Sequence, residues 1–152
     1  MLKTNKDIND VNFILDNLRK EDKEEIIELW GDNWKDKFIK NTMSTEFLIL
    51  TNNNIPIAMG GIVPISNSQL RIACVWLLCS VYVKNHKILL LRTIKKHIDI
   101  ASSEFDILYN YIYKLNFEAK KWLKNLGFKF DNPSPPNLEV REGFEFFYKL
   151  NR

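Results

Sequence analysis

The sequence predicts an α/β layered domain built on a mixed sheet, and three observations support this prediction. The stretch 73–80 (ACVWLLCS) is almost wholly apolar between polar neighbours, which is typical of a strand buried on both faces. The stretch 88–101 carries apolar residues at helical spacing, so this strand leads into an amphipathic helix. Shorter strand and helix patterns surround both, in the order β-α-α-β-β-β-α-β-α-β-β.

The first part of the chain predicts one strand and two helices. Residues 11–18 (VNFILDNL) have an apolar centre and are interpreted as the first strand. In the next stretch, 19–30, Asp22 followed by Glu25 fits a helix N-cap with a residue reaching back to it. A second short helix is predicted over 32–41. The two helices are interpreted as a wall beside an acceptor or, equally well, as simple packing on the sheet.

Two strands and a tight turn are predicted before the central strand. The strands cover 47–50 and 55–65, and the asparagines at 52–54 favour a turn because Asn tolerates positive φ. Gly60-Gly61 inside the second strand predicts a bulge or the close approach of another backbone.

Three strands and a helix are predicted after the central helix. The strands cover 107–112, 128–130 and 144–150. The helix begins at Asn116, a good N-cap residue, and Gly127 is well placed for the position after its last turn. Turns are predicted at 67–69 and 131–136 from their Asn, Ser and Pro residues.

Length and composition favour one soluble domain over residues 1–152. A chain of 152 residues with 45% hydrophobic and 27% charged residues needs no disulfide or metal to fold. The net charge of +3 is too small to indicate nucleic-acid binding, for which a concentrated basic face is expected. Nucleic-acid binding through the lysines of the two later helices is therefore the weakest hypothesis; these are Lys95, Lys96, Lys120, Lys121 and Lys124.

The two cysteines, Cys74 and Cys79, lie five apart on one predicted strand and point to opposite faces, so they do not pair. We expect buried free thiols in a reducing compartment, and no metal-ligand spacing is present. The polar N-terminus does not resemble a signal peptide, and every apolar run is too short to span a bilayer. A cytoplasmic protein without a membrane partner is expected.

The join between the central strand and its helix is the candidate binding site. A helix start leaves N–H groups unpaired and carries partial positive charge, and this join adds Lys84, His86 and Lys87. We expect a phosphate or diphosphate to bind here; the alternative is a solvated helix start without a ligand. His86 as a general base is a weaker hypothesis, and a Cys79/His86 nucleophile pair lacks a third, orienting group.

The chain resembles the GNAT acyltransferase fold. The likeness covers most of the chain by topology, and it is strongest in Asn116, Ala119 and Leu126-Gly127-Phe128. It implies a mixed, splayed central sheet flanked by helices, with acetyl-CoA between the strand ending at Ser80 and the strand ending near Ile112. An amine acceptor, small molecule or protein, would approach from the first two helices. The implied cofactor-binding residues are Cys79, Ser80, Lys84, Asn85, His86, Lys87 and Asn116.

A closer resemblance is to the internal virion protein A family of short-tailed phages, which looks like a branch of the same fold. It rests on the segments 75–80 and 108–112, on His86 with Arg92, and on 122–128 (WLKNLGF). It implies a phage-encoded protein linked to virion assembly, with a virion or host protein as partner.

Two departures from the GNAT pattern keep a non-catalytic protein as the alternative to an N-acyltransferase. No glycine lies between Val81 and Arg92, where GNAT enzymes use glycines to let phosphate approach the backbone. Leu123 takes the place of the tyrosine that often protonates the leaving thiolate, and no carboxylate lies on the central strand. The catalytic acid and base are therefore unassigned, and a plugged cofactor cleft would favour the alternative.

Overall fold

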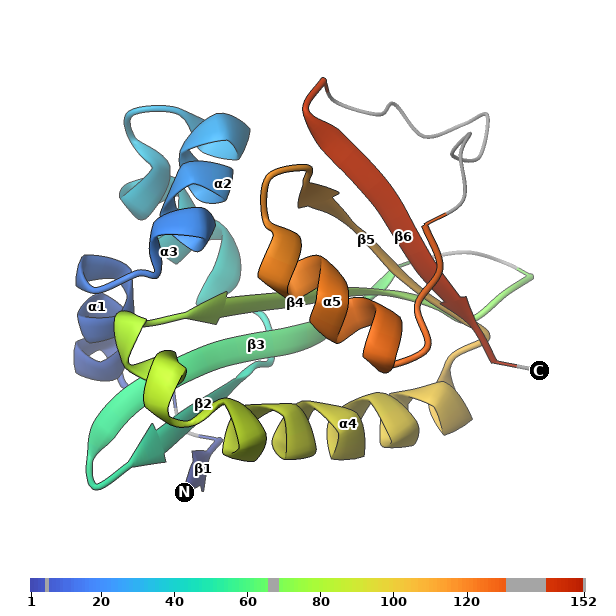
Figure 1. Cartoon of the computed structure of the whole chain (residues 1–152), viewed down its shortest axis with the longest axis horizontal. Coiled ribbons are helices and arrows are strands. Elements are labelled where there is room, and N and C mark those ends of the chain that lie inside the picture. The colour runs from blue at the N-terminus through green and yellow to red at the C-terminus, as the bar shows by residue number, and fades with distance from the viewer. Residues whose placement is uncertain (5, 66–68, 131–141, 152) are drawn as a thin grey trace. The chain divides into compact units, whose positions relative to one another are not determined.

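The computed structural model describes residues 1–4, 6–65, 69–130 and 142–151 (Figure 1). The predicted loop at 131–136 and most of the turn at 67–69 lie outside these residues. The described elements are β1 (Leu2–Lys3), α1 (Ile8–Asp16), α2 (Lys20–Trp30), α3 (Trp34–Thr42), β2 (Leu48–Asn52), β3 (Ile55–Ile65), β4 (Ile72–Cys79), the 3₁₀ helix η1 (Val81–Asn85), α4 (Lys87–Glu104), β5 (Ile107–Tyr113), α5 (Phe117–Asn125) and β6 (Phe144–Leu150).

The six strands form one sheet in the order β1-β2-β3-β4-β5-β6. Strands β1 and β2, β2 and β3, and β5 and β6 pair antiparallel, whereas β4 and β5 pair parallel. A parallel pair needs a crossover, and the long helix α4 supplies it between β4 and β5. The predicted α/β class with a mixed sheet is therefore confirmed.

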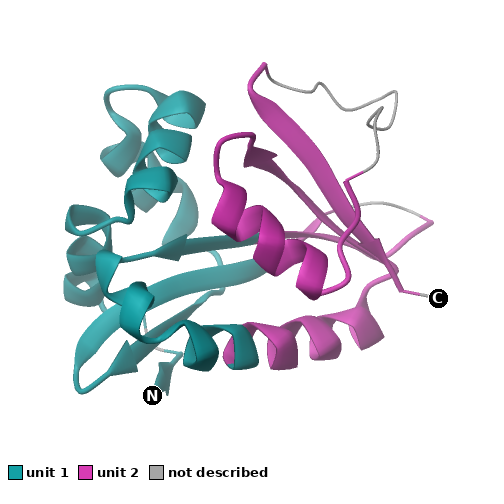
Figure 2. Ribbon diagram, viewed as in Figure 1, with its two compact units in different colours: residues 1–63, 76–92 teal, residues 64–75, 93–152 magenta. Residues whose placement is uncertain are grey.

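The chain forms two compact units, coloured separately in Figure 2. Unit 1 holds residues 1–63 and 76–92, and unit 2 holds residues 64–75 and 93–152. The chain passes between the units within β3, within β4 and again within α4.

The first predicted strand is wrong, because residues 8–16 form helix α1. Val11, Ile14 and Leu15 are buried, and their spacing of three and four residues places them on one face of α1, while the buried Leu18 follows the helix and forms a β-bridge with Ser80. The helix begins after Asp7, whose carboxylate accepts a hydrogen bond from the Asn9 N–H. A strand would have turned half of these apolar side chains toward water, so packing selects the helix.

Helices α2 and α3 confirm the two predicted helices, but Asp22 is not an N-cap. Arg19 precedes α2 and makes no side-chain cap, while Asp22 lies inside the helix and is only 3% exposed. Phe38 of α3 packs in the core of unit 1, edge-on against Trp76 of β4 with ring centroids 5.6 Å apart. These contacts seat both short helices against the sheet of this unit.

The β2–β3 hairpin forms as predicted. Its turn holds Asn53 and Asn54 at φ 50° and 63°, the left-handed conformation that Asn tolerates. Gly60 confirms the predicted close approach, since a Cβ there would lie 2.8 Å from the carbonyl oxygen of Trp76. Glycine is therefore needed here for backbone proximity between β3 and β4.

Replacing Gly60 by alanine is expected to lower the free energy of unfolding by about 1–3 kcal/mol, because the added methyl overlaps backbone that cannot move away alone. Urea denaturation measures this loss. Gly31→Ala serves as a comparison without a clash: nothing lies within 4 Å of the added carbon, so any loss of stability there reports the strain of its φ of +77° alone. A Gly60→Ala protein as stable as the wild type would contradict the close approach.

Unit 2 contains the helix boundaries that the sequence predicted for α5. The Asn116 side chain accepts from the Ala119 N–H, which confirms it as the N-cap. At the other end Gly127 has φ +93°, and the Phe128 N–H bonds the carbonyl of Leu123 as in a Schellman motif. The predicted strand 128–130 is reduced to one bridge between Lys129 and Tyr148, because only that residue exchanges backbone hydrogen bonds with β6.

Candidate functional site

The end of β4 in unit 1 is already hydrogen-bonded within the chain. The Cys79 N–H donates to Asp22 Oδ2 at 2.9 Å, and the Cys79 carbonyl accepts from the Arg19 N–H at 2.9 Å. Ser80 donates its N–H to the carbonyl of Ile57 at 2.8 Å and its hydroxyl to that of Pro56 at 3.0 Å. The backbone N–H groups of both predicted binding residues are therefore engaged in the fold.

A buried ion pair, which the sequence analysis missed, supports this strand end. The Arg19 Nη2 donates to Asp22 Oδ1 at 2.9 Å, and the two side chains are 11% and 5% exposed. Burial lowers the pKa of the Arg19 guanidinium, but the charge of Asp22 and the hydrogen bond to it outweigh that effect, so the pKa is raised. One carboxylate thus joins the start of α2 to the last residue of β4.

In unit 1, Cys79 and Leu77 lie on the edge of β4 that faces away from β3. Because Ser80 bonds Ile57 of β3, the even-numbered residues of β4 present their backbone groups to β3 and the odd-numbered ones to the opposite edge. On that edge Cys79 is held by Asp22 and Arg19. Leu77, two residues earlier, presents its N–H and C=O in the same direction.

The predicted join is built from η1 and the first residue of α4. Lys84, Asn85 and Lys87 are exposed, and His86 is half-buried, immediately before an 18-residue helix. His86 Nδ1 lies 3.2 Å from the Asn52 amide nitrogen. When that amide donates, the imidazole proton sits on Nε2, so His86 offers a hydrogen-bond donor rather than a base there.

Unit 2 contains Asn116 and the parallel strand pair. Backbone pairing between β4 and β5 covers Ile72–Cys74 and Ile107–Tyr109, although β5 continues to Tyr113. Asn116 is 1% exposed, and its carboxamide oxygen caps α5. The structure thus places the predicted site residues in two groups, with Cys79 to Lys87 in unit 1 and Asn116 in unit 2.

The groups that acid–base or nucleophilic chemistry would use are few. Cys79 is 1% exposed, and Leu123 is half-buried on α5. Tyr111 on β5 has a buried hydroxyl without a hydrogen-bond partner among the described residues. Over the same residues, no cluster of three His, Cys, Asp or Glu side chains is arranged to hold a metal, and no helix combines the length and hydropathy that a membrane crossing requires.

Burial raises the pKa of the Cys74 thiol from 9.0 to about 11. The folded protein therefore keeps this proton at a pH where the unfolded chain loses it, so the contribution of Cys74 to stability is full below pH 9 and is lost as pH rises toward about 11. Urea denaturation across this range is expected to show a smaller loss of stability in Cys74→Ala than in the wild type. Equal slopes for both proteins would contradict the raised pKa.

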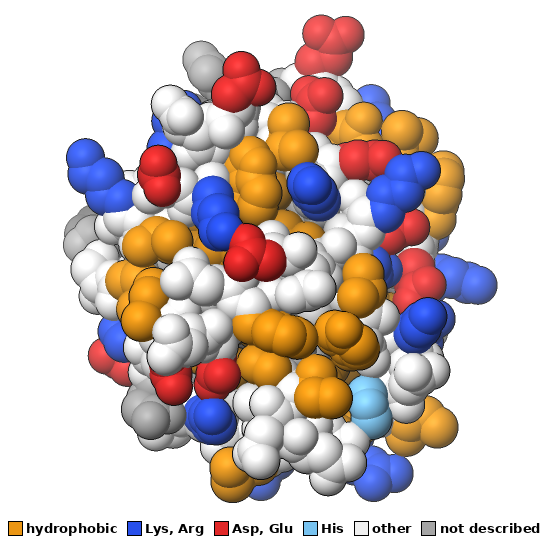
Figure 3. All heavy atoms as spheres, turned by 90° about the vertical axis from the view of Figure 1, so that its left-hand side faces the viewer, with side chains coloured by type: hydrophobic (Ala, Val, Ile, Leu, Met, Phe, Trp, Pro, Cys, Tyr) orange, Lys and Arg blue, Asp and Glu red, His pale blue; other side chains and the backbone are white. Residues whose placement is uncertain are grey.

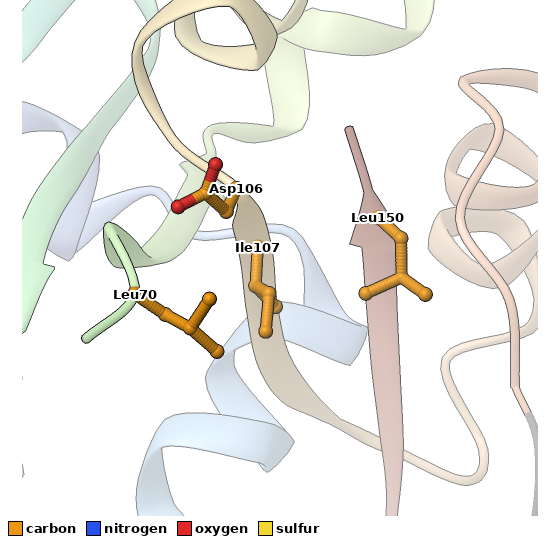
Figure 4. Close-up of a pocket in the computed structure, with 4 residues that line it drawn as sticks. All are labelled: Leu70, Asp106, Ile107 and Leu150. Atoms are coloured by element: carbon orange, nitrogen blue, oxygen red, sulfur yellow. The ribbon is translucent and has the colours of Figure 1, made fainter. Parts of the chain in front are cut away.

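A surface hollow of about 300 Å³ lies in unit 2 and is lined by none of the predicted site residues. Figure 4 shows its lining side chains: Leu70, Asp106, Ile107 and Leu150. Asp106 is bonded to Arg71, with its Oδ2 accepting the backbone N–H at 3.0 Å and its Oδ1 the guanidinium at 3.2 Å. Because its one carboxylate is held by Arg71, the hollow presents mainly apolar groups.

Charged side chains of both signs are interspersed on the face shown in Figure 3, with apolar side chains between them. Nucleic-acid binding requires basic side chains gathered along one face. This face has no such arrangement among its described residues, and the expectation that the protein does not bind nucleic acid stays a prediction.

Comparisons with known proteins identify the fold. No protein-family model matches the chain, and a search of curated proteins finds no match. Among solved structures, the chain is similar to a GNAT-family acetyltransferase from Streptococcus pneumoniae, with TM-score 0.66 and 15% identity over 99% of this chain and 98% of that one. The chain therefore has the GNAT acetyltransferase fold, as the sequence predicted.

Two further structures share the fold at similar distance. An acetyltransferase from Streptococcus agalactiae gives TM-score 0.69 at 12% identity over 99% of this chain and 97% of that one. Spermidine N-acetyltransferase from Vibrio cholerae, solved in complex with CoA and spermine, gives TM-score 0.65 at 14% identity over 99% and 95%. At these identities the likeness shows the fold, and the chemistry has to be argued from the residues of this chain.

Proposed function

We propose that the protein is an acyl-CoA-dependent N-acyltransferase that transfers an acyl group, with acetyl as the expected one, to an amine. The observation that carries the proposal is a GNAT fold that covers 99% of the chain and whose β4 leads into a basic helix start. A structural neighbour with the same fold was solved with CoA and the polyamine spermine, which supports both the cofactor class and the acceptor class.

The helix start fits the phosphate groups of such a cofactor. Lys84 and Lys87 are exposed beside the first turn of α4, where N–H groups and the helix dipole favour anions. His86 adds an Nε2–H donor when its Nδ1 accepts from Asn52. Together these groups replace, with side-chain charge, the glycine-rich backbone that GNAT enzymes use.

The thioester arm would meet β4 at Leu77. Amide groups of an extended arm pair with a free strand edge in the manner of an added strand. The Cys79 backbone groups are held by Asp22 and Arg19, so Leu77 is the nearest earlier residue on this edge that can take that part. Cys79 and Ser80 were predicted to bind the cofactor; in this arrangement they would contribute by shaping the end of the strand.

The rate of acyl transfer would be raised mainly by holding the amine and the thioester next to each other. Holding an amine against a thioester replaces an encounter in solution by a reaction between neighbours, which lowers the entropic part of the barrier. Backbone N–H donors at the strand edge would stabilise the oxyanion that forms at the thioester carbonyl. The acid and the base remain unassigned among the described residues, and an amine of low pKa would need less help from a base.

Isothermal titration calorimetry of the whole chain with acetyl-CoA tests the proposal. We expect saturable binding with one site, followed by release of free CoA when a mixture of primary amines and polyamines is added. Pantetheine and adenosine 3′,5′-bisphosphate, titrated separately, show which end of the cofactor is held. Absence of heat at high protein concentration would remove the proposal.

A second candidate is a non-catalytic protein of the same fold. It is favoured by the occupied backbone at Cys79 and Ser80, where groups of the chain itself take the hydrogen bonds at the strand end. The resemblance to the phage family would then give it a role in virion assembly or in binding a host protein. This candidate predicts neither acetyl-CoA binding nor turnover, so the same titration separates the two.

A further inference from the structure

In unit 2, the parallel pairing of β4 and β5 stops before β5 ends. The last pair is Cys74 with Tyr109, yet β5 continues for four residues, to Tyr113. Ending a parallel ladder costs hydrogen bonds, unless the N–H and C=O groups next in line find other partners. The partners of these backbone groups show why the ladder ends here.

The next hydrogen bond of the ladder would join the Tyr111 N–H to the Val75 carbonyl. The ladder begins with the Ile107 N–H donating to the Arg71 carbonyl at 3.2 Å. In a parallel pair such bonds recur every second residue on each strand, which leads from Arg71 and Ile107 to Val75 and Tyr111. Both of these groups instead bond a side chain.

That side chain is the carboxamide of Asn110. Its Nδ2 donates to the Val75 carbonyl at 2.6 Å, and its Oδ1 accepts from the Tyr111 N–H at 2.7 Å. The orientation of the amide is fixed by these partners, because a flipped amide would set donor against donor and acceptor against acceptor. The two hydrogen bonds and the amide between them take the place of one direct ladder bond.

Asn110 therefore satisfies both backbone groups while keeping them further apart than a single hydrogen bond allows. Asn is unfavourable inside strands, where β-branched and aromatic residues such as the neighbouring Tyr109, Tyr111 and Ile112 predominate. A residue that breaks the local preference and is fully bonded in doing so is typical of a functional constraint.

We propose that Asn110 is a positioning residue that ends the β4–β5 ladder at Val75 and Tyr111, and that binding of the thioester cofactor depends on the ladder ending there. The second half of this statement rests on the proposed function. The first half concerns the protein alone and does not depend on any ligand. Asn110 acts by separating two strands and needs no contact with the reacting atoms.

The test replaces Asn110 by valine, a strand-forming residue that cannot bond either backbone group. We expect the Tyr111 N–H to bond the Val75 carbonyl directly, seen as a scalar coupling across the hydrogen bond between labelled Tyr111 N and Val75 C′ that the wild type lacks. Asn110→Ala is the second variant should valine fold poorly, with the same expectation. Asn110→Asp keeps the acceptor for Tyr111 but sets a carboxylate against the carbonyl, so the coupling should stay absent.

The affinity for acetyl-CoA is the second readout. We expect it to fall at least tenfold in Asn110→Val and to be unchanged in Asn151→Ala, which removes another side-chain bond to backbone in unit 2, from Asn151 Nδ2 to the Phe105 carbonyl. A folded valine or alanine variant without the new coupling would overturn the role of Asn110. Coupling without loss of affinity would overturn its link to the cofactor, whereas a wild type that binds no acetyl-CoA would overturn the proposed function and leave the coupling result intact.

Discussion

Replacing Asp22 by alanine is expected to lower the free energy of unfolding by about 3–5 kcal/mol, since the Arg19 charge stays largely buried and keeps a longer ion pair, 3.8 Å from its Nε, to the more exposed Glu21. Arg19 would keep its position at 11% side-chain exposure without the carboxylate that lies 2.9 Å away. The Cys79 N–H would also lose its acceptor at the end of β4. Urea denaturation followed by tryptophan fluorescence measures the loss.

Asp99→Ala provides the control for this variant. Asp99 forms a 2.6 Å ion pair with Lys95 on the same helix, but the two side chains are 67% and 55% exposed, Lys95 first. A pair this exposed contributes roughly 0–1 kcal/mol. Asp22→Asn, which keeps the shape but removes the charge, should fall between the two. Equal stability of the Asp22→Ala and Asp99→Ala proteins would show that the Arg19–Asp22 pair is not buried as described.

Replacing both Lys84 and Lys87 by alanine is expected to weaken acetyl-CoA binding at least about a hundredfold, because hydrogen bonds to charged groups contribute roughly 1.5–3 kcal/mol each. Both side chains are exposed at the start of α4, so the fold should be unaffected. Calorimetry with acetyl-CoA measures the affinity. The effect should shrink as salt is added, since exposed charges are screened.

Lys95→Ala with Lys96→Ala gives the control, because it removes the same amount of charge at exposed positions of α4 that lie more than a turn beyond Lys87. Acetyl-pantetheine, which lacks the nucleotide and its phosphates, should bind the Lys84/Lys87 double variant and the wild type equally. If the control pair weakens acetyl-CoA binding as strongly, the lysines act through net charge alone, and the join is not the phosphate site.

The elements with one clear hydrophobic period were predictable from the sequence. Strand β3 begins and ends where it was predicted, at Ile55 and Ile65, and β6 does so at Phe144 and Leu150. The N-cap at Asn116 and the glycine at 127 were also readable, because caps depend on a few neighbouring residues. Strand bounds and helix caps of this kind depend on neighbouring residues, so the sequence alone is enough to predict them.

Helix α1 was misread because its apolar residues fit two patterns. Val11, Phe13 and Leu15 alternate as in a strand, while Val11, Ile14, Leu15 and Leu18 follow a helix face. The choice between them depends on what covers the segment, and the structure buries the helical set. Sequence periodicity cannot resolve a segment that satisfies both periods.

The sequence by itself determined the α/β class, the central strand leading into a basic helix start, and the likeness to the GNAT fold. Only the tertiary structure decided that Asp22 caps Cys79, 57 positions away, and that Asn110 bonds Val75, 35 positions away. The physical reason is that a polar side chain chooses among partners brought together by packing, and the spacing of residues along the chain carries no record of that choice.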